Sequence, residues 1–205
     1  MAITYPLALP TATGIRNIAF RARNAVAYNF SPFTFQGQAQ AYSGQMWEAD
    51  ITLPPIKDRS DAEVWNAFIL SLRGQLGTFT MGDPNGATAR GTASTSAGSP
   101  VISSQIGSTI SVTGATASQT GYLLQGDYVQ FGSGSTATLH KVLADANTNG
   151  SGNLTLEIWP GLRSSRSGTM VVSSPVGRFR LANNDTGWVA DIQQYSITFS
   201  AREAI

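Results

Sequence analysis

The residues able to perform acid–base chemistry are few and scattered. The chain has one histidine, His140, which lies beside Lys141 in a stretch whose pattern predicts a strand. Such a histidine is more often a surface residue than a catalyst. The sequence contains neither a Gly-x-Ser-x-Gly nucleophile elbow nor a phosphate-binding loop. We therefore expect a protein that is not an enzyme.

Two arrangements of carboxylates could carry chemistry. Glu48 and Asp50 lie two residues apart in a predicted strand, so both side chains point to the same face. Two such carboxylates can form the catalytic pair of a glycosidase, but more commonly they belong to a solvated polar face. Asp83, Asp127 and Asp145 could meet at a calcium ion, although the first two fall in turn-like sequences. The chain has no cysteine, which excludes disulfides and zinc–thiolate sites. We expect no catalytic residue, no metal and no cofactor.

Two arginines have the right spacing to meet these carboxylates. Arg21 and Arg23 share one face of a predicted strand and can approach Glu48 and Asp50 across a sheet or across a subunit boundary. Ordinary cross-strand pairing is the simpler of the two arrangements. These four residues are the candidates for a subunit interface or for the lining of a lumen.

The composition limits the class of protein. The 205 residues are 41% hydrophobic and 12% charged, with a net charge of +1, which allows a packed core and argues against a nucleic-acid-binding domain. The low charge suits a β-rich protein whose surface is partly covered by neighbours. No signal peptide and no apolar run long enough to span a bilayer is visible. We expect a protein made in a cytoplasm, with no membrane partner.

One helix is predicted, over residues 61–73. Ser60 is the expected N-cap, and Glu63 would complete a capping box. The apolar residues of this segment follow the i, i+3, i+4, i+7 spacing and share one face: Trp65, Phe68, Ile69 and Leu72. A single amphipathic helix cannot bury such a face alone, so we expect it to pack on a sheet.

Strand-like alternation dominates the remaining sequence. It predicts strands at 15–27, 33–35, 47–53, 77–84, 177–181 and 188–201, the last with Ile192 among its apolar members. Four further short strands are predicted at 106–112, 122–131, 139–143 and 154–159, the last stopped by Pro160. The Gly-, Ala-, Ser- and Thr-rich stretch at 85–100 predicts a flexible linker.

These elements predict a mainly β protein in two parts. Residues 1–90 and 175–205 are expected to form a discontinuous β-sandwich domain with one flanking α-helix. Residues 91–174 are expected to form an inserted small all-β, barrel-like domain, joined through the linker at 85–100. Insertion into an exposed loop costs the host domain little, because loop-closure entropy grows slowly with length.

Several stretches in this order resemble virion proteins of long-tailed bacteriophages, most closely the distal tail and minor tail proteins. They are an extended N-terminal segment with the strand after it (5–23), a strand–helix–strand unit (47–55, the helix, and 77–84) and a barrel-like module (126–130, 140–142, 154–163). The resemblance implies a β-sandwich with a flanking helix that forms a ring, usually of six subunits. The family has no catalytic motif, so no site residue is carried over.

The resemblance implies a structural function. The protein would be a ring-forming connector between the tail tube and the baseplate hub of a phage tail tip, assembled in the host cytoplasm and retained in the virion. Its partners would be copies of itself, a tail tube protein and a hub protein, with DNA only passing through the lumen.

Two other classes remain open from the sequence. A carbohydrate-binding module would recognise a host surface glycan through exposed aromatic side chains, for which Tyr122, Tyr128 and Trp159 are the candidates. A small hydrolase is the third class, and the residue inventory argues against it.

Overall fold

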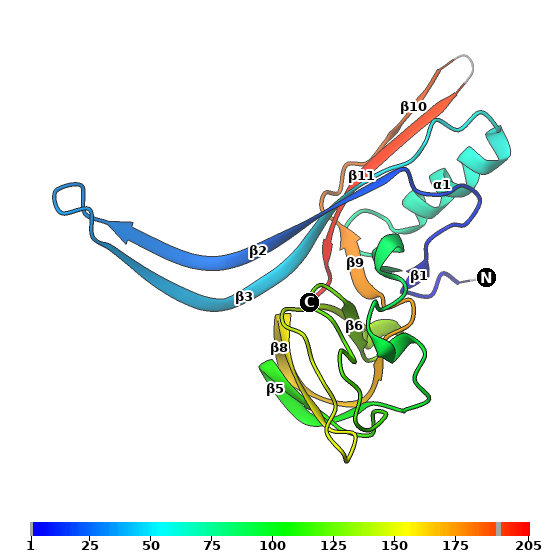
Figure 1. The fold of residues 1–205 in the computed structure, drawn as a ribbon. Coiled ribbons are helices and arrows are strands. Elements are labelled where there is room, and N and C mark those ends of the chain that lie inside the picture. The colour runs from blue at the N-terminus through cyan, green and yellow to red at the C-terminus, as the bar shows by residue number, and fades with distance from the viewer. Residues whose placement is uncertain (1, 192–193) are drawn as a thin grey trace.

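The computed structural model of the protein describes residues 2–191 and 194–205, so the expected strand position of Ile192 lies outside the described residues. The described chain is mainly β, with one α-helix and two sheets (Figure 1). The strands of the first sheet are β1 (Leu7–Ala8), β2 (Asn17–Phe30), β3 (Gly37–Thr52), β4 (Phe79–Met81), β9 (Gly177–Leu181), β10 (Trp188–Ala190) and β11 (Tyr195–Glu203). Those of the second are β5 (Val101–Val112), β6 (Tyr128–Phe131), β7 (Thr138–Val142) and β8 (Leu154–Val171).

The first sheet brings together strands from both ends of the chain. Its order is β1-β4-β9-β11-β3-β2, and β10 pairs with β11 beside this path. Among the strand pairs described in this sheet, only β1 and β4 are parallel. The central strand β11, near the C-terminus, therefore lies between β3 and β9, and the chain from 82 to 176 leaves this sheet and returns to it.

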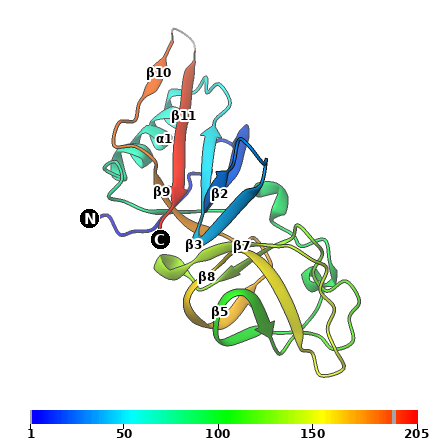
Figure 2. The same ribbon diagram turned by 90° about the vertical axis from the view of Figure 1, so that its left-hand side faces the viewer.

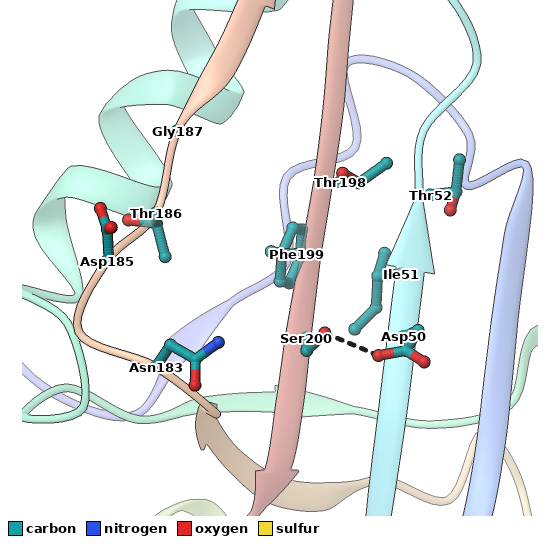
Figure 3. A pocket seen from close by; sticks show the side chains of 10 residues that line it. All are labelled: Asp50, Ile51, Thr52, Asn183, Asp185, Thr186, Gly187, Thr198, Phe199 and Ser200. Carbon is teal, nitrogen blue, oxygen red and sulfur yellow. Dashed lines mark hydrogen bonds between the residues drawn. The ribbon is translucent and has the colours of Figure 1, made fainter.

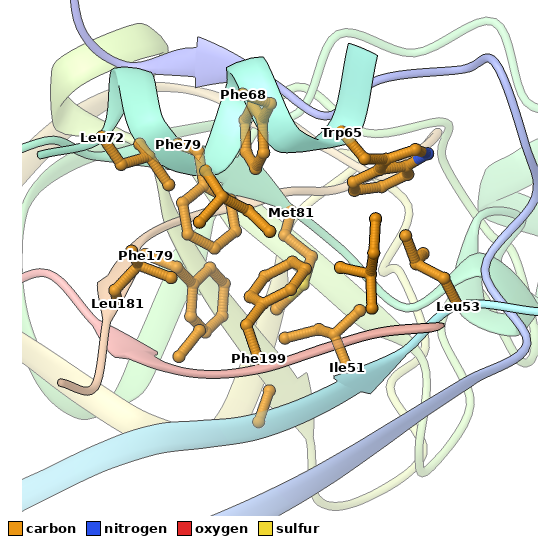
Figure 4. Packing of buried hydrophobic residues seen from close by; sticks show 14 of the residues in the cluster. Ile51, Leu53, Trp65, Phe68, Leu72, Phe79, Met81, Phe179, Leu181 and Phe199 are labelled. Atoms are coloured by element: carbon orange, nitrogen blue, oxygen red, sulfur yellow. The ribbon is translucent and has the colours of Figure 1, made fainter. Parts of the chain in front are cut away.

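The helix α1 (Arg59–Ser71) packs on this sheet, as expected. The four predicted residues are buried in one hydrophobic cluster with residues of β3, β4, β9 and β11 (Figure 4). The predicted cap is wrong by two residues, because the Asp58 side chain accepts the backbone N–H of Ser60 at 2.8 Å. Asp58 has the extended backbone that is typical of an N-cap residue, so the helix begins at Arg59 and Ser60 lies inside its first turn. Glu63 instead pairs with Arg59 at 3.6 Å.

Two strand predictions are corrected by pairing. Residues 33–35 do not form a strand but belong to the connection between β2 and β3, where the backbone of Phe35 has a φ of 56°. The expected long strand at 188–201 is two strands, because β11 pairs antiparallel with β10 and places Ile197 opposite Trp188. In both places apolar alternation in the sequence continues beyond the residue at which a strand ends, Phe30 in β2 and Ala190 in β10. Alternation alone does not mark a reversal of the chain.

The second sheet has the order β5-β8-β6-β7, with an additional pairing of β8 and β7. Within the described residues these pairings form no closed barrel. Pro160 does not stop β8, contrary to the prediction. The β5–β8 register shifts between Gly107, opposite Leu162, and Thr109, opposite Glu157. Pro160 falls in this irregular stretch, where a missing N–H is tolerated.

The stretch at 85–100 is packed rather than a bare linker. It contains two short 3₁₀ helices, η1 (Pro84–Gly86) and η2 (Thr92–Ser94). Ala89 and Ala93 are buried in the core of the second sheet. Small residues suit this segment because a Cβ on Gly91 would lie 2.3 Å from the carbonyl oxygen of Tyr122.

Candidate assembly surface

The four candidate charged residues lie on one face of the β2–β3 hairpin. Arg21 pairs with Asp50 at 2.5 Å and Arg23 with Glu48 at 2.8 Å, both diagonally across the two strands. All four side chains are exposed or partly exposed, because the alternate residues of these strands fill the core. The ion pairs are thus satisfied within the chain, as in ordinary cross-strand pairing. Such exposed pairs contribute little to stability.

A shallow polar hollow of about 360 Å³ adjoins one of these residues (Figure 3). Asp50 lines it and accepts a hydrogen bond from Ser200 Oγ at 2.6 Å. Asn183 and Asp185, from the connection before β10, form the other side. No group of three or more possible metal ligands occurs among the described residues, and we assign no chemistry to the hollow.

The most unusual surface is the outer half of the same hairpin, residues 24–45, which we call the arm. It extends well beyond α1 and the second sheet in Figure 1, and in Figure 2 it is seen foreshortened, because that side of the molecule faces the viewer. Residues 24–44 are exposed except for the half-buried Ser31. The arm contains no charged residue. An exposed β ribbon normally carries charges that keep it from pairing with other chains, and this one lacks them.

One face of the arm is apolar. Val26, Tyr28 and Phe30 alternate along β2, and Ala41, Ala39 and Gly37 lie opposite them on β3. On β2 these residues lie on the same face as Phe20, which packs against the core of the first sheet. In contrast to Phe20, Val26, Tyr28 and Phe30 are 53%, 67% and 48% exposed. The sheet therefore extends its apolar face beyond its own core.

The charge-free arm was not singled out by sequence reasoning. The absence of Asp, Glu, Lys and Arg over residues 24–45 could have marked it. Two strand predictions touched this segment. The strand predicted at 15–27 is longer than expected, and the residues predicted as a strand at 33–35 belong to the connection between β2 and β3.

Near the base of the arm, an ion pair between Arg163 and the buried Glu203 joins the second sheet to the first. Glu203 on β11 accepts hydrogen bonds from Arg163 on β8 at 2.7 and 3.0 Å and from the backbone N–H of Trp47 at 3.1 Å. Nearby, Gln45 Oε1 accepts the backbone N–H of Gly161 at 2.8 Å. Trp159 Nε1 donates to Asn24 Oδ1 at 2.7 Å. These contacts fix the direction in which the arm leaves the body.

His140 is buried, contrary to the prediction of a surface residue. Its Nδ1 lies 2.6 Å from the carbonyl oxygen of Pro160, and its Nε2 lies 2.8 Å from Thr138 Oγ1. Burial lowers the pKa of His140 to about 4. The imidazole of His140 is therefore neutral and links β7 to β8 by a hydrogen bond.

The three aspartates considered for calcium have separate roles. Asp127 is buried and accepts hydrogen bonds from the backbone N–H groups of Arg90, Gly91 and Leu124. Asp83 caps η1 by accepting the N–H of Asn85, and Asp145 accepts the N–H of Gln125. Each carboxylate therefore holds a local loop.

The aromatic residues considered for glycan binding do not form an exposed platform. Tyr122 and Tyr128 are buried, and burial raises the pKa of both phenols. Trp159 packs edge-on against Trp47 with 4.5 Å between ring centroids. Sugar rings stack on accessible aromatic faces, which the two tyrosines do not offer.

Comparison with family models and with curated proteins finds no match to this sequence. The helix of the described chain is too short and too polar to cross a membrane.

Proposed function

We propose that the chain is a structural virion protein of a phage tail tip, a ring-forming connector between the tail tube and the baseplate hub. The observation that carries the proposal is the exposed, charge-free arm with its apolar face. A free monomer that exposed such a ribbon would be prone to uncontrolled edge pairing. A subunit of a larger assembly would cover it.

The resemblance to distal tail proteins supplies the kind of assembly. In this proposal residues 1–90 and 175–205 form the ring domain, usually six copies in that family, and the barrel-like unit at 91–174 lies outside the ring. The neighbours are a tail tube protein and a baseplate hub protein. The protein has no enzymatic activity and is assembled in the host cytoplasm into the virion.

The charged strand face fits the lining of a lumen. Arg21 and Arg23 are neutralised by Asp50 and Glu48, so the face carries little net charge. Such a surface neither retains nor strongly repels DNA, which in the proposal only passes through the ring.

Electron microscopy of intact particles tests the proposal. We expect density for this chain as a closed ring around the tail axis, between tube and hub. Density only at fibre tips, or absence of the chain from purified particles, would overturn the assignment to the tail tip.

A further inference from the structure

A groove of about 800 Å³ lies at the base of the arm. The hairpin forms one wall with residues 24–26 and 43–46, and the second sheet forms the other with residues 106–108 and 161–163. Ile106 and the C-terminal Ile205 line it and are 60% and 68% exposed. A concave site of this size with exposed apolar side chains suits the burial of aromatic rings.

The charges at the groove are already paired. Arg23 and Arg163 line it, and their partners are Glu48 at 2.8 Å and Glu203 at 2.7 Å. An uncharged segment can therefore enter the groove without leaving either cation unpaired, whereas an acidic segment would have to compete with an existing carboxylate. The groove favours an uncharged, apolar occupant.

The tip of the arm, residues 31–36, is such an uncharged, apolar segment. Phe33 and Phe35 are 91% and 77% exposed. The turn that presents them is closed by two backbone hydrogen bonds of 2.9 Å, from Ser31 N–H to the Gln36 carbonyl and from Phe35 N–H to the Ser31 carbonyl. A preorganised turn loses little conformational entropy when it docks.

The tip and the groove of one chain lie at opposite ends of the arm. From Asn24 to Phe30 the strand β2 advances by six residues, or about 20 Å along its path. The hairpin is continuously paired except for a register shift between Asn24 and Val26, so it does not fold back on its own base. A tip can reach such a groove only on another molecule.

We propose that the tip of one copy docks in the groove of a second copy of this chain, with Phe33 and Phe35 against Ile106 and Ile205. Each chain carries one tip and one groove at different places, so the contact is head-to-tail and can close into a ring. Both complementary surfaces are present on this chain, which favours a second copy over an unrelated protein. The inference rests on the proposed function and names the contact that links its subunits.

Cysteine cross-linking tests this contact directly, because the chain has no cysteine of its own. Purified Phe33→Cys and Ile106→Cys proteins are mixed and oxidised over a range of concentrations. We expect a disulfide-linked heterodimer on non-reducing gels. The matched control pairs Phe33→Cys with Leu76→Cys, which is 69% exposed but lies between α1 and β4, outside the groove.

A charge substitution provides a second readout. Phe33→Asp should weaken self-association by about tenfold or more in sedimentation velocity, because a central aromatic contact is replaced by a desolvated charge. Leu70→Asp, at a 60% exposed position of α1, is the control and should leave association unchanged. Both sites are exposed, so circular dichroism should show native folding in each variant.

Several results would overturn the contact. These are cross-linking no greater than in the Leu76 control, cross-linking only between two Phe33→Cys tips, or a protein that stays monomeric at every concentration. Binding of the tip only by an added tail protein would likewise exclude a second copy as the occupant. If the chain forms a ring in intact particles but the cross-link does not form, only this contact is refuted. If the cross-link forms but the chain is absent from purified particles, only the tail function is refuted.

Discussion

Arg163 on β8 pairs with the buried carboxylate of Glu203 on β11, with 2.7 Å between Nη2 and Oε2. The Glu203 side chain is only 3% exposed, whereas that of Arg163 is 25% exposed. This pair ties the second sheet to the first beside the backbone of Trp47.

Arg163→Met should therefore be costly. It leaves the Glu203 carboxylate buried with the Trp47 N–H but without its cation, and we expect a loss of about 3 kcal/mol in the free energy of unfolding, measured by denaturant titration. The double variant Arg163→Met/Glu203→Gln should recover part of this loss. Arg21→Met, which breaks an exposed pair, is the control and should cost less than about 1 kcal/mol. Equal losses in the free energy of unfolding for Arg163→Met and Arg21→Met would contradict the argument that burial of Glu203 makes its ion pair important.

Phe68→Ala should destabilise the first sheet. Phe68 is 7% exposed and packs edge-on against Phe79 with 5.6 Å between ring centroids. We expect a loss of about 3–5 kcal/mol in a denaturant titration. Leu70→Ala on the same helix removes an exposed side chain and should change stability by about 0.5 kcal/mol or less. A loss below about 1 kcal/mol for Phe68→Ala would refute its role in the core.

The burial of His140 predicts a pH dependence of stability. Its pKa is 6.5 in the unfolded reference and about 4 in the folded protein, so the unfolded chain binds the extra proton between these values. The stability that the neutral, buried His140 contributes is fully present above pH 6.5 and is lost as the pH falls towards 4. The free energy of unfolding should fall by up to about 1.4 kcal/mol per pH unit in this range. Thermal unfolding of the wild type and of His140→Gln from pH 8 to 4 measures this. The variant should show a shallower slope, and parallel slopes would exclude His140 as the source.

Deletion of residues 101–172 should harm the first sheet, although the sequence predicts a separable insert. Tyr128 and Leu139 belong to the hydrophobic cluster of the first sheet, and the Leu139 carbonyl accepts Trp47 Nε1–H at 3.0 Å. The deletion would leave Trp47 without these contacts. We expect loss of a cooperative unfolding transition by circular dichroism. A variant that unfolds cooperatively with wild-type stability would instead establish an independent inserted domain.

The sequence was sufficient for elements whose pattern depends on near neighbours. The buried face of α1 follows from helical spacing, because residues three and four apart share a face whatever the helix packs on. The strand at 177–181 was located to the residue, since alternation ends there in turn-forming sequence. The lack of cysteine is likewise readable without any structure.

The tertiary structure alone determined which segments pair and what is buried. His140 is buried because Pro160, twenty residues later, accepts its hydrogen bond, and Glu203 is buried because Arg163 and Trp47 meet it from distant strands. The alternation of Val26, Tyr28 and Phe30 predicts an apolar face equally well for a covered and for an uncovered strand. Only the folded chain shows that the core ends before this face does, because core extent depends on long-range packing and not on local periodicity.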